Sequence, residues 1–461
     1  MNRISILDCG AVPGDHALQT AAIQSAIDRA YLMGGGTVEI PAGEYHTGDI
    51  RLRSNVTLFL RKGAHLCGSQ DPMDYFHHRE DRIEPLRPEQ ITDAPYVHLS
   101  TIHGETAYEE NKKEYRFKRI PSSRWNNALI RAIDAENIAI LGEEGAEIDG
   151  SNCFDPQGEE EYRGPHGITL FGCRNIRLSG YTIRNTGNWA HNLLWCENIS
   201  VEQITVLAGH DGFDAAVCRN VSIKNSDFYT GDDCIAGFGN TNVCVSGCKL
   251  NSSCSAFRFG GTNVRVRDCE IWGPGKYSFR GVLSMEEKRA CAPSPETGKG
   301  GRSNCLSVFT YYADYSVPIP ERPGNILIEN CRVRNVDRFL HYNFSGNETW
   351  QRYRPLDDIT FRDMEAEDIG MPLTAWGDEL DRVELRLRDV RIRMREGSGA
   401  DSLIRAGNFS RITLENVHVE NLHAPALIKQ WTEGEISLRN VEHTAETDVA
   451  RTEEDFFCRP I

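Results

Sequence analysis

Three aspartates stand at spacings that could bring their carboxyl groups together. Asp211 precedes Asp232 by 21 residues and Asp233 follows at once, inside a stretch that otherwise alternates polar and apolar residues. Carboxylates forced into one site cannot all stay ionised cheaply, so one of them is expected to keep its proton near neutral pH. A protonated carboxyl group beside an ionised one is what acid–base cleavage of a glycosidic bond requires. The alternative, that these residues only shape polar turns, involves no chemistry.

A repeat of about 22 residues organises the chain around these aspartates. The phrase Asn-apolar-x-apolar recurs with its asparagine at positions 175, 198, 220, 242 and 263, which are 23, 22, 22 and 21 residues apart. Each copy is typical of one or two short strands followed by a polar turn. The period fits one coil of a parallel β-helix, whose stacked coils bury their apolar faces against one another. We therefore predict an all-β fold, a single-stranded parallel β-helix of about 10 coils forming one domain over residues 1–461.

The same period predicts where the aspartates lie. With a coil of about 22 residues, Asp233 follows Asp211 by one coil in the same column, and Asp232 is its neighbour in the sequence. Strands on adjacent coils are about 4.8 Å apart, and this offset plus side-chain length can reach the roughly 6.5–9.5 Å between the carboxyl groups of inverting glycosidases. The recurring asparagines predict a stacked ladder of turns with left-handed backbone, which needs no ligand.

One helix is predicted before the repeats, within residues 16–36. The stretch TAAIQSAIDRAYLM begins at Thr20 as the N-cap and ends at a run of three glycines. Its apolar residues follow helical spacing: Ile23, Ile27, Ala30 and Met33. The open end of a β-helix exposes unpaired strand edges, so this helix is expected to cap it.

Two stretches break the period and are predicted to be long insertions. They are residues 72–125, rich in charged and aromatic residues, and residues 281–322, which contain EEKRACAPSPETGKGGRSN. Long loops on a rigid scaffold are commonly functional. We expect both near a groove, where they could wall off one end.

Composition narrows the classes of partner and compartment. The formal net charge of −16 disfavours nucleic acid and anionic membranes as partners, and no apolar run is long enough to span a bilayer. The opening MNRISILDCGAVPGD is unlike a signal peptide. The 15 cysteines include no CxxC pair, which favours buried free thiols over a metal cluster. These features predict a cytoplasmic protein with no metal and no cofactor; they say nothing about its oligomeric state.

Several stretches resemble the polygalacturonase family, glycoside hydrolase family 28. The opening DCGAVPGDHALQTAAIQSAIDRAYLMGGGTVEIPAGEY is similar to the family's N-terminal cap, and GNWAHNLLWCENISVEQITV to its central coils. Its motif Asn-Thr-Asp-Gly-x-Asp stands here as GHDGFD, residues 209–214, and its Gly-Asp-Asp-Cys is intact at residues 231–234. The resemblance implies a right-handed β-helix and inverting hydrolysis. It also implies that Asp232 is the general acid, while Asp211 and Asp233 hold the attacking water.

Two family motifs that recognise the sugar are absent or altered. The family's Gly-His-Gly falls on Cys254-Ser255-Ala256, and its Arg-x-Lys is not recognisable. His210, in place of the family's Thr, is a candidate for related work. Arg258 and Arg280 are 22 residues apart, which predicts that they stack in one column, where they could bind an acidic sugar, neutralise the acidic cluster or cover a coil surface.

Two weaker candidates for substrate contact are His191, near the family's groove region, and Tyr311, on a later coil; packing between coils would explain both equally. The predicted activity is exo-acting hydrolysis of short pectin-type oligosaccharides, such as galacturonides. One alternative is a calcium-dependent polysaccharide lyase, with calcium held by Asp211, Asp214, Asp232 and Asp233 and with Arg280 as the base. The other is a non-catalytic carbohydrate-binding β-helix.

Overall fold

The structure is a computed structural model that describes residues 2–76, 123–290, 302–313, 319, 321–344 and 354–454. The chain divides into two compact units, described separately below. Unit 1 contains the described residues up to 232 together with 276–290 and 302; unit 2 contains 233–275 and the described residues from 303 onward. The predicted insertions at 72–125 and 281–322 lie largely outside the described residues, so they stay predictions, as does the single domain.

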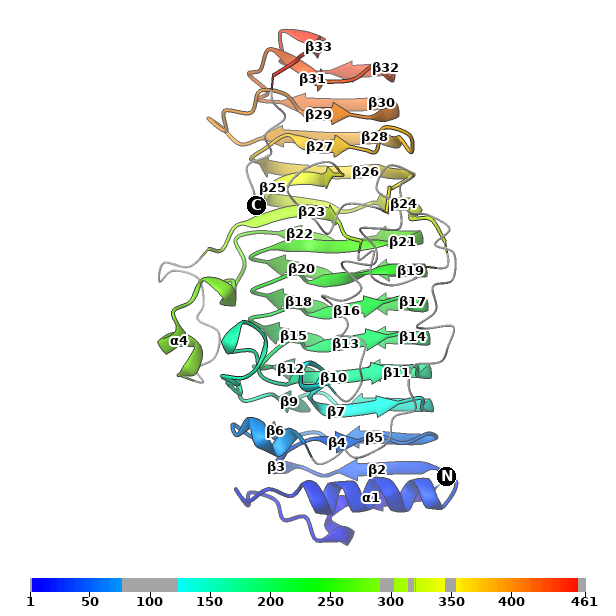
Figure 1. Cartoon of the computed structure of the whole chain (residues 1–461), viewed down its shortest axis with the longest axis vertical. Helices are drawn as coiled ribbons and strands as arrows, with labels where there is room; N and C mark the ends of the chain where they lie inside the picture. The colour runs from blue at the N-terminus through cyan, green and yellow to red at the C-terminus, as the bar shows by residue number, and fades with distance from the viewer. Residues whose placement is uncertain are drawn as a thin grey trace. The chain divides into compact units, whose positions relative to one another are not determined.

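Unit 1 is built from three parallel sheets (Figure 1). The first contains β1 (Asn2–Ser5), β2 (Gly36–Ile40), β5 (Val56–Leu60), β8 (Glu136–Gly142), β11 (Arg174–Ser179), β14 (Glu197–Glu202) and β17 (Arg219–Lys224). The second contains β3 (Gly43–Thr47), β6 (Ala64–Gly68), β9 (Glu147–Asp149), β12 (Thr182–Arg184), β15 (Thr205–Ala208) and β18 (Asp227–Thr230). The third contains β4 (Ile50–Arg51), β7 (Ala128–Ile133), β10 (His166–Phe171), β13 (His191–Leu194) and β16 (Phe213–Ala216). Successive coils each add one strand to every sheet, so the predicted parallel β-helix is confirmed.

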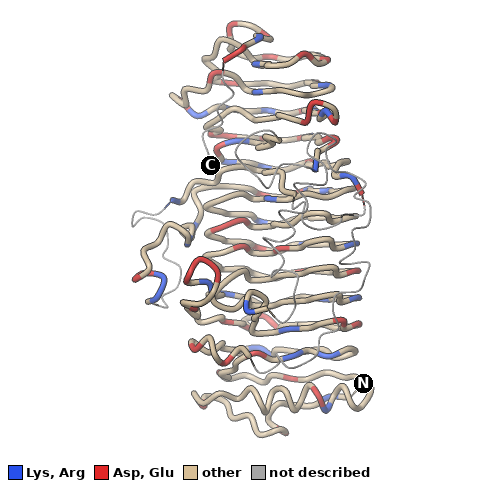
Figure 2. Tube along the Cα trace, viewed as in Figure 1, with Lys and Arg blue, Asp and Glu red and all other residues tan. Residues whose placement is uncertain are grey.

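Unit 2 continues this pattern with longer strands that turn from one sheet into the next. For example, β21 pairs with β23 through Ser255–Phe259 and with β24 through Thr262–Arg267. Basic and acidic residues alternate along several of its outward faces (Figure 2), as where Arg393 pairs with Glu367 at 3.0 Å. The strands are β19 (Ile235–Ser246), β20 (Lys249–Ser252), β21 (Ser255–Arg267), β22 (Glu270–Trp272), β23 (Cys305–Tyr311), β24 (Gly324–Glu329), β25 (Arg332–Asn343), β26 (Asp358–Ile369), β27 (Leu373–Trp376), β28 (Val383–Met394), β29 (Ile404–Gly407), β30 (Phe409–Glu420), β31 (Ala426–Gln430), β32 (Glu435–Glu442) and β33 (Thr447–Arg451).

The predicted cap helix is α1 (Thr20–Leu32), which lies along β2 at the N-terminal end of unit 1 (Figure 1). Its inner face is fully buried: Ile23, Ala26, Ile27 and Ala30. Two details of the prediction are wrong. The N-cap is Gln19, because the hydroxyl of Thr20 instead accepts a hydrogen bond from the amide of Gly48 at 2.8 Å. Met33 is 52% exposed, because the helix ends before it.

Six short helical turns complete the described elements. They are η1 (Ile6–Cys9), η2 (Pro72–Tyr75), η4 (Arg124–Asn126), η5 (Glu159–Glu161), η6 (Arg280–Val282) and α4 (Met285–Arg289). Within the described residues, no helix is long and apolar enough to cross a membrane. The cysteines of this part of the chain are free thiols, and Cys173, Cys196 and Cys218 stack inside successive coils of unit 1.

The core follows from the alternation within each strand. Residues on alternate sides point inward and meet the same position of the next coil, as Ile138, Ile176, Ile199 and Val221 do in one column of unit 1. Burying apolar side chains stabilises the stack by about 25 cal/mol for each Å² removed from water. Because every coil supplies the wall for its neighbours, this stabilisation depends on the strands keeping their register.

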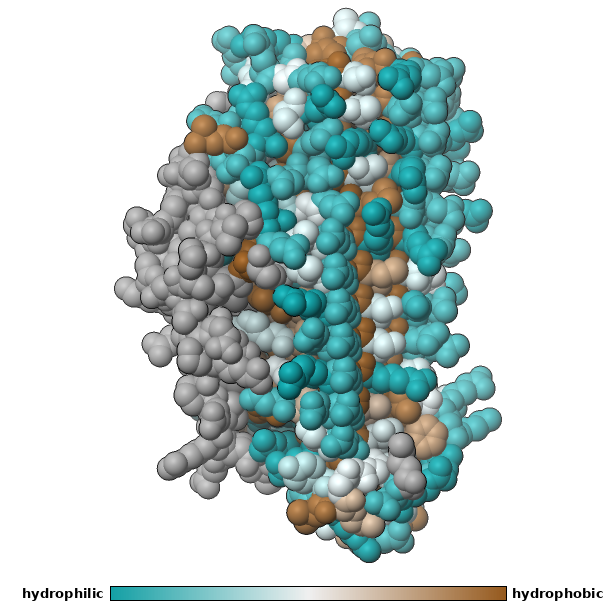
Figure 3. Space-filling view, turned by 90° about the vertical axis from the view of Figure 1, so that its right-hand side faces the viewer, coloured by the Kyte–Doolittle hydropathy of each residue, from teal (hydrophilic) through white to brown (hydrophobic). Residues whose placement is uncertain are grey.

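The predicted asparagine ladder is confirmed. Asn198 donates from Nδ2 to Oδ1 of Asn175 at 3.0 Å and accepts a bond of 2.9 Å from Asn220. All three residues have left-handed backbone, with φ between 56° and 58°. Asn263 bonds Asn242 in the same way in unit 2, at 3.2 Å. Figure 3 shows hydrophilic side chains in rows along the coils, with apolar side chains visible between the rows.

Two candidate sugar-binding residues are instead core residues. His191 is fully buried: its Nδ1 lies 2.8 Å from the carbonyl of Gly212, which can only accept, so Nδ1 carries the proton and Nε2 accepts from the hydroxyl of Tyr181 at 2.9 Å. Tyr311 is also fully buried and donates to the carbonyl of Arg354. Neither side chain reaches a surface where a sugar could touch it, so packing explains both, and their proposed contact with substrate is withdrawn.

Replacing Asn198 with Ala should destabilise unit 1 by about 1–2 kcal/mol. The substitution removes two exposed ladder hydrogen bonds and places a Cβ without a side-chain amide in the left-handed region. Asn198→Gly, which tolerates that backbone, should lose less. Urea unfolding measures both, with Ser200→Ala on the outer face of the same strand as the control. Equal stability of Asn198→Ala and wild type would contradict the role assigned to the ladder.

His191 should make stability depend on pH. Burial lowers its pKa to about 4, whereas the unfolded chain titrates near 6.5. The unfolded state therefore binds a proton first, so stability is complete above about pH 6.5 and falls as the pH drops toward 4. Between pH 7 and pH 5 this group should account for about 2 kcal/mol of lost stability. His191→Gln should show a correspondingly smaller change over that range, and the exposed His418→Gln should not; parallel curves for all three proteins would refute the assignment.

Candidate active site

In unit 1, Asp211 and Asp232 occupy the same corner of two adjacent coils. The strands β15 and β18 pair in register, with Ala208 opposite Thr230. Asp211 follows Ala208 by three residues and Asp232 follows Thr230 by two, so both leave their strands at the same turn. The backbone fixes this corner: the carbonyl of Asp211 accepts from the amide of Ala190 at 2.9 Å, and that of Asp232 accepts from the Thr230 hydroxyl at 2.7 Å. Asp211 is buried and Asp232 half-buried.

The glycine before Asp232 is required by the space around it. A Cβ on Gly231 would lie 2.3 Å from the carbonyl oxygen of Ser278 and 2.6 Å from that of Gly209. Distances this short require the backbone to move, so only glycine lets the two turns and the segment at Ser278 approach one another. This gives a physical reason for the first residue of the Gly-Asp-Asp-Cys motif.

Directly before Asp211, His210 is buried behind the corner. Its ring stacks on that of Tyr162, with centroids 5.9 Å apart, and its Nδ1 lies 3.3 Å from Nη1 of Arg163. Burial lowers the pKa of His210 well below its usual value, and the nearby cations, Arg163 first, lower it further. The imidazole is therefore neutral and accepts from Arg163. Because it is almost without exposed surface, direct contact with a sugar, as the sequence suggested, is not supported.

Three buried cations surround this histidine; we call them the basic cluster: Arg163, Arg280 and Lys288. Arg280 donates from Nη1 to Oδ1 of Asn152 at 2.6 Å. The ammonium of Lys288 lies 4.2 Å from the centre of the Tyr162 ring and donates to the carbonyl of Gly281 at 3.1 Å.

The negative groups near Arg163 keep this positive charge in place. Burial lowers the pKa of Arg163, but Tyr162, Glu160 and Asp232 raise it by more, so it is raised overall. Arg163 donates from Nε to Glu160 at 2.9 Å. The basic cluster therefore interacts with the acidic corner through Arg163 and Asp232.

The predicted column of Arg258 and Arg280 is wrong. In unit 2 the register places Arg258 opposite Ala236 on one side and Thr310 on the other. Arg280 belongs to η6, in the part of unit 1 after residue 276, so the two arginines are not one coil apart. The spacing of 22 misled because β22 is followed by a departure from the repeat, and the next coil begins only at β23.

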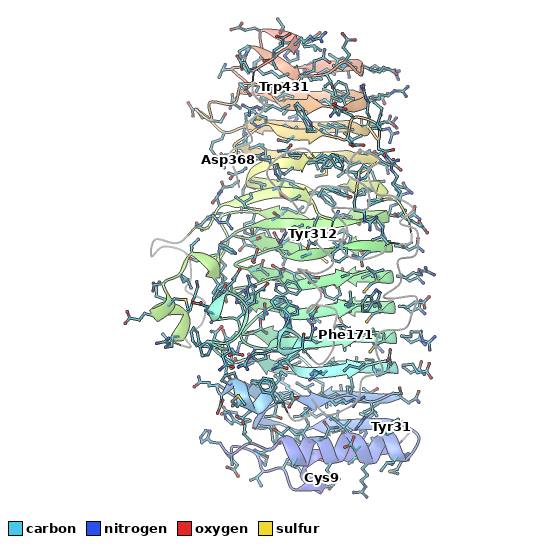
Figure 4. The ribbon with its side chains drawn as sticks, in the orientation of Figure 1. Cys9, Tyr31, Phe171, Tyr312, Asp368 and Trp431 are labelled. Carbon is cyan, nitrogen blue, oxygen red and sulfur yellow. The ribbon has the colours of Figure 1, made fainter. Side chains whose placement is uncertain are left out.

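Unit 2 holds Asp233 in a separate set of contacts. This carboxylate is fully buried, and its Oδ1 accepts from the amide of Ser255, the residue at the family's histidine position, at 2.9 Å. Nη1 of Arg258 lies 4.0 Å from Oδ2. The same guanidinium lies 4.3 Å from the ring centre of Tyr312, which is labelled in Figure 4 and in turn contacts Phe238 edge-on. The side chain of Arg258 is 33% exposed, so it can still reach a ligand.

Sequence reasoning missed Arg163, Lys288 and Tyr312. Arg163 stands in the irregular stretch EEYRGPHG and Lys288 in EEKR, where no periodicity assigns a side chain to a face. Tyr312 follows a buried strand and carries no motif. The proximity of Arg163 to the GHDGFD motif results from folding across 47 residues, which a repeat of about 22 does not indicate.

Comparison with known proteins agrees with the motifs. Residues 101–255 match the family described as Glycosyl hydrolases family 28. A probable polygalacturonase from Vitis vinifera is 28% identical over 244 residues, covering 50% of this chain and 43% of that protein. An exo-poly-alpha-D-galacturonosidase from Dickeya chrysanthemi is 28% identical over 262 residues, covering 51% and 42%. The matched regions thus span less than half the length of these relatives.

Solved structures share the fold at low identity. An exopolygalacturonase from Thermotoga maritima has a TM-score of 0.64 at 18% identity, covering 91% of this chain and 92% of its own. The adhesin PfbA of Streptococcus pneumoniae has a TM-score of 0.56 at 12% identity, covering 98% and 100%. Because an exopolygalacturonase and an adhesin both have this fold, the fold alone does not assign an activity. The resemblance predicted from the motifs is confirmed by the family match: residues 101–255 of this chain are a glycosyl hydrolases family 28 region carried on a parallel β-helix.

Proposed function

We propose that this protein is an inverting glycoside hydrolase that removes sugars from the end of acidic, pectin-type oligosaccharides. The observation that carries the proposal is the placement of Asp211 and Asp232 at one corner of adjacent coils in unit 1, with Asp233 next in the sequence. The exo preference and the galacturonide class come from the name of the Dickeya chrysanthemi relative.

In the proposed reaction, Asp232 is the general acid. It donates its proton to the glycosidic oxygen while the bond from that oxygen to the anomeric carbon breaks. Asp211 and Asp233 hold a water molecule, take its proton and direct its oxygen to the opposite face of the anomeric carbon. The configuration at that carbon is therefore inverted, as expected when a water molecule attacks directly.

Local charge supports an acidic substrate. The chain carries a net charge of −16, which opposes the approach of an anionic sugar. The basic cluster beside His210 reverses the sign of the field locally, although its buried side chains do not themselves need to touch the sugar. Arg258 is the exposed cation of the described site residues and is proposed to contact the sugar carboxylate.

We further propose that the protein acts in the cytoplasm, on imported oligosaccharides. The free thiols of the described cysteines support this proposal, since most are buried within the coils and none needs an oxidising compartment to fold. Fractionation of the source cells with an antibody against the chain would test the location.

Asp232→Asn should lower kcat/KM at least about 100-fold, because it removes the proton that the leaving group requires. Release of reducing ends from defined galacturonic-acid oligosaccharides measures this loss. Asp227→Asn, on the preceding strand β18, is the matched control and should remain active. Near-normal hydrolysis by Asp232→Asn would refute the assignment. A product with an ultraviolet-absorbing double bond, formed only in the absence of chelator, would instead establish the lyase.

Arg258→Ala should raise KM for acidic oligosaccharides about tenfold or more, the effect of losing one charge-assisted hydrogen bond. The value of kcat should change less, because this arginine binds the sugar and does not move a proton. Arg265→Ala, at an exposed position of the same strand, is the control. An unchanged KM for Arg258→Ala would show that this residue only balances the charge of Asp233.

A further inference from the structure

A group of metal-binding side chains lies at the N-terminal end of unit 1; we call it the cap His–Glu cluster: His16, Glu44 and His46. Glu44 and His46 are two residues apart on β3 and so point to the same side of the sheet, with the buried Tyr45 between them pointing inward. His16 belongs to the turn that leads into α1, and its side chain is 84% exposed. The cluster is therefore on the outer surface, accessible to solvent.

The three donor atoms converge on one point. Nδ1 of His16 lies 3.3 Å from Nε2 of His46, and that nitrogen lies 2.7 Å from Oε1 of Glu44. The remaining distance, from His16 Nδ1 to Glu44 Oε1, is 3.7 Å. In a tetrahedral zinc site, ligand bonds of about 2.0–2.2 Å place neighbouring donor atoms about 3.3–3.5 Å apart. The observed triangle needs only small side-chain rotations to match this geometry.

Hydrogen bonding alone satisfies this arrangement poorly. The carboxylate of Glu44 can only accept, so His46 must donate from Nε2 to it. Nδ1 of His16 also faces that nitrogen, which leaves one proton among three acceptor-type atoms. A divalent cation in place of that proton would bond to all three.

The backbone already holds the ligand-bearing segments together. The amide of Gly14 donates to the carbonyl of Glu44 at 2.9 Å, and the amide of Gln19 donates to that of His46 at 2.8 Å. The turn containing His16 is thus fixed to both ligand residues of β3 on either side of the histidine. Such preorganisation reduces the entropy lost on binding an ion.

The adjoining coil extends the field that would attract a cation. In the register of β3 and β6, Glu44 lies opposite His65, and His46 lies opposite Cys67. Burial first, and then the charges of Glu44 and Asp149, raise the pKa of the Cys67 thiol to about 12. The thiol therefore stays protonated near neutral pH and is not expected to be a ligand, while the surrounding carboxylates favour a positive ion.

We propose that the cap His–Glu cluster binds a divalent transition-metal ion of the zinc class through His16 Nδ1, His46 Nε2 and the carboxylate of Glu44. Imidazole and carboxylate together suit zinc, and three protein ligands leave a position for water. The bound ion joins the turn before α1 to the first coil, at the end of the core that α1 covers. Its role is to hold the cap in place, and it does not depend on the proposed hydrolase activity.

Titration of the metal-stripped full-length protein with zinc, in competition with a fluorescent chelator, tests this site. Wild type should bind one zinc ion with a dissociation constant in the micromolar range or below, and should unfold at a higher temperature with zinc than without. His16→Ala and His46→Ala should each weaken binding at least tenfold and abolish that thermal shift. Because His16 is largely exposed, its replacement leaves the core unchanged.

His418→Ala is the matched control for these two variants. His418 also contacts two carboxylates, but through opposite ring nitrogens, 2.9 Å from Glu442 and 3.1 Å from Glu420, so its donors do not converge. This control should bind zinc as wild type does, and Cys67→Ser should too. With cobalt(II), wild type should give a visible spectrum without a thiolate charge-transfer band. Zinc binding of wild-type strength in the double variant His16→Ala/His46→Ala, or no binding by wild type at 100-fold excess zinc, would overturn the proposal.

Discussion

The backbone hydrogen bonds between parallel strands are the constraint on which the other features depend. They hold each coil in register with its neighbours, so residues at one phase of the repeat stack in columns about 4.8 Å apart. In unit 1 this register produces the asparagine ladder from Asn175 to Asn220. It also brings Asp211 and Asp232, which are far apart in sequence, to one corner. The same constraint that stabilises the coils therefore positions the acidic side chains.

The corner combines an acidic pair with buried positive charge. Taken alone, neighbouring carboxylates repel each other, and the negative net charge of the chain would add to that cost. Arg163 offsets it by interacting with Asp232 on one side and with neutral His210 on the other. The segment that supplies Arg280 and Lys288 lies outside the repeat. The coils thus set the geometry, and an irregular segment adjusts the charge around it.

The periodic part of this structure could be predicted from the sequence, and the irregular part could not. The recurring asparagines, the cap helix and the shared corner of Asp211 and Asp232 all follow from a spacing near 22 residues. The same spacing failed for Arg258 and Arg280, because the chain leaves the repeat after β22. It also failed to separate surface from core: His191 and Tyr311 are polar enough to suggest a ligand, yet their hydrogen bonds are satisfied inside the stack. Burial depends on which neighbours fill each column, and one repeat does not specify them.

The central claim is that the carboxyl groups at this corner cleave a glycosidic bond by direct attack of water. Proton NMR during the first minutes of hydrolysis of a defined galacturonic-acid oligosaccharide tests it most directly, because the anomer released first records the face from which water attacked. The account predicts that this sugar appears with configuration opposite to that of the cleaved bond and only later equilibrates. Initial release of the retained anomer, or of an unsaturated sugar, would contradict it.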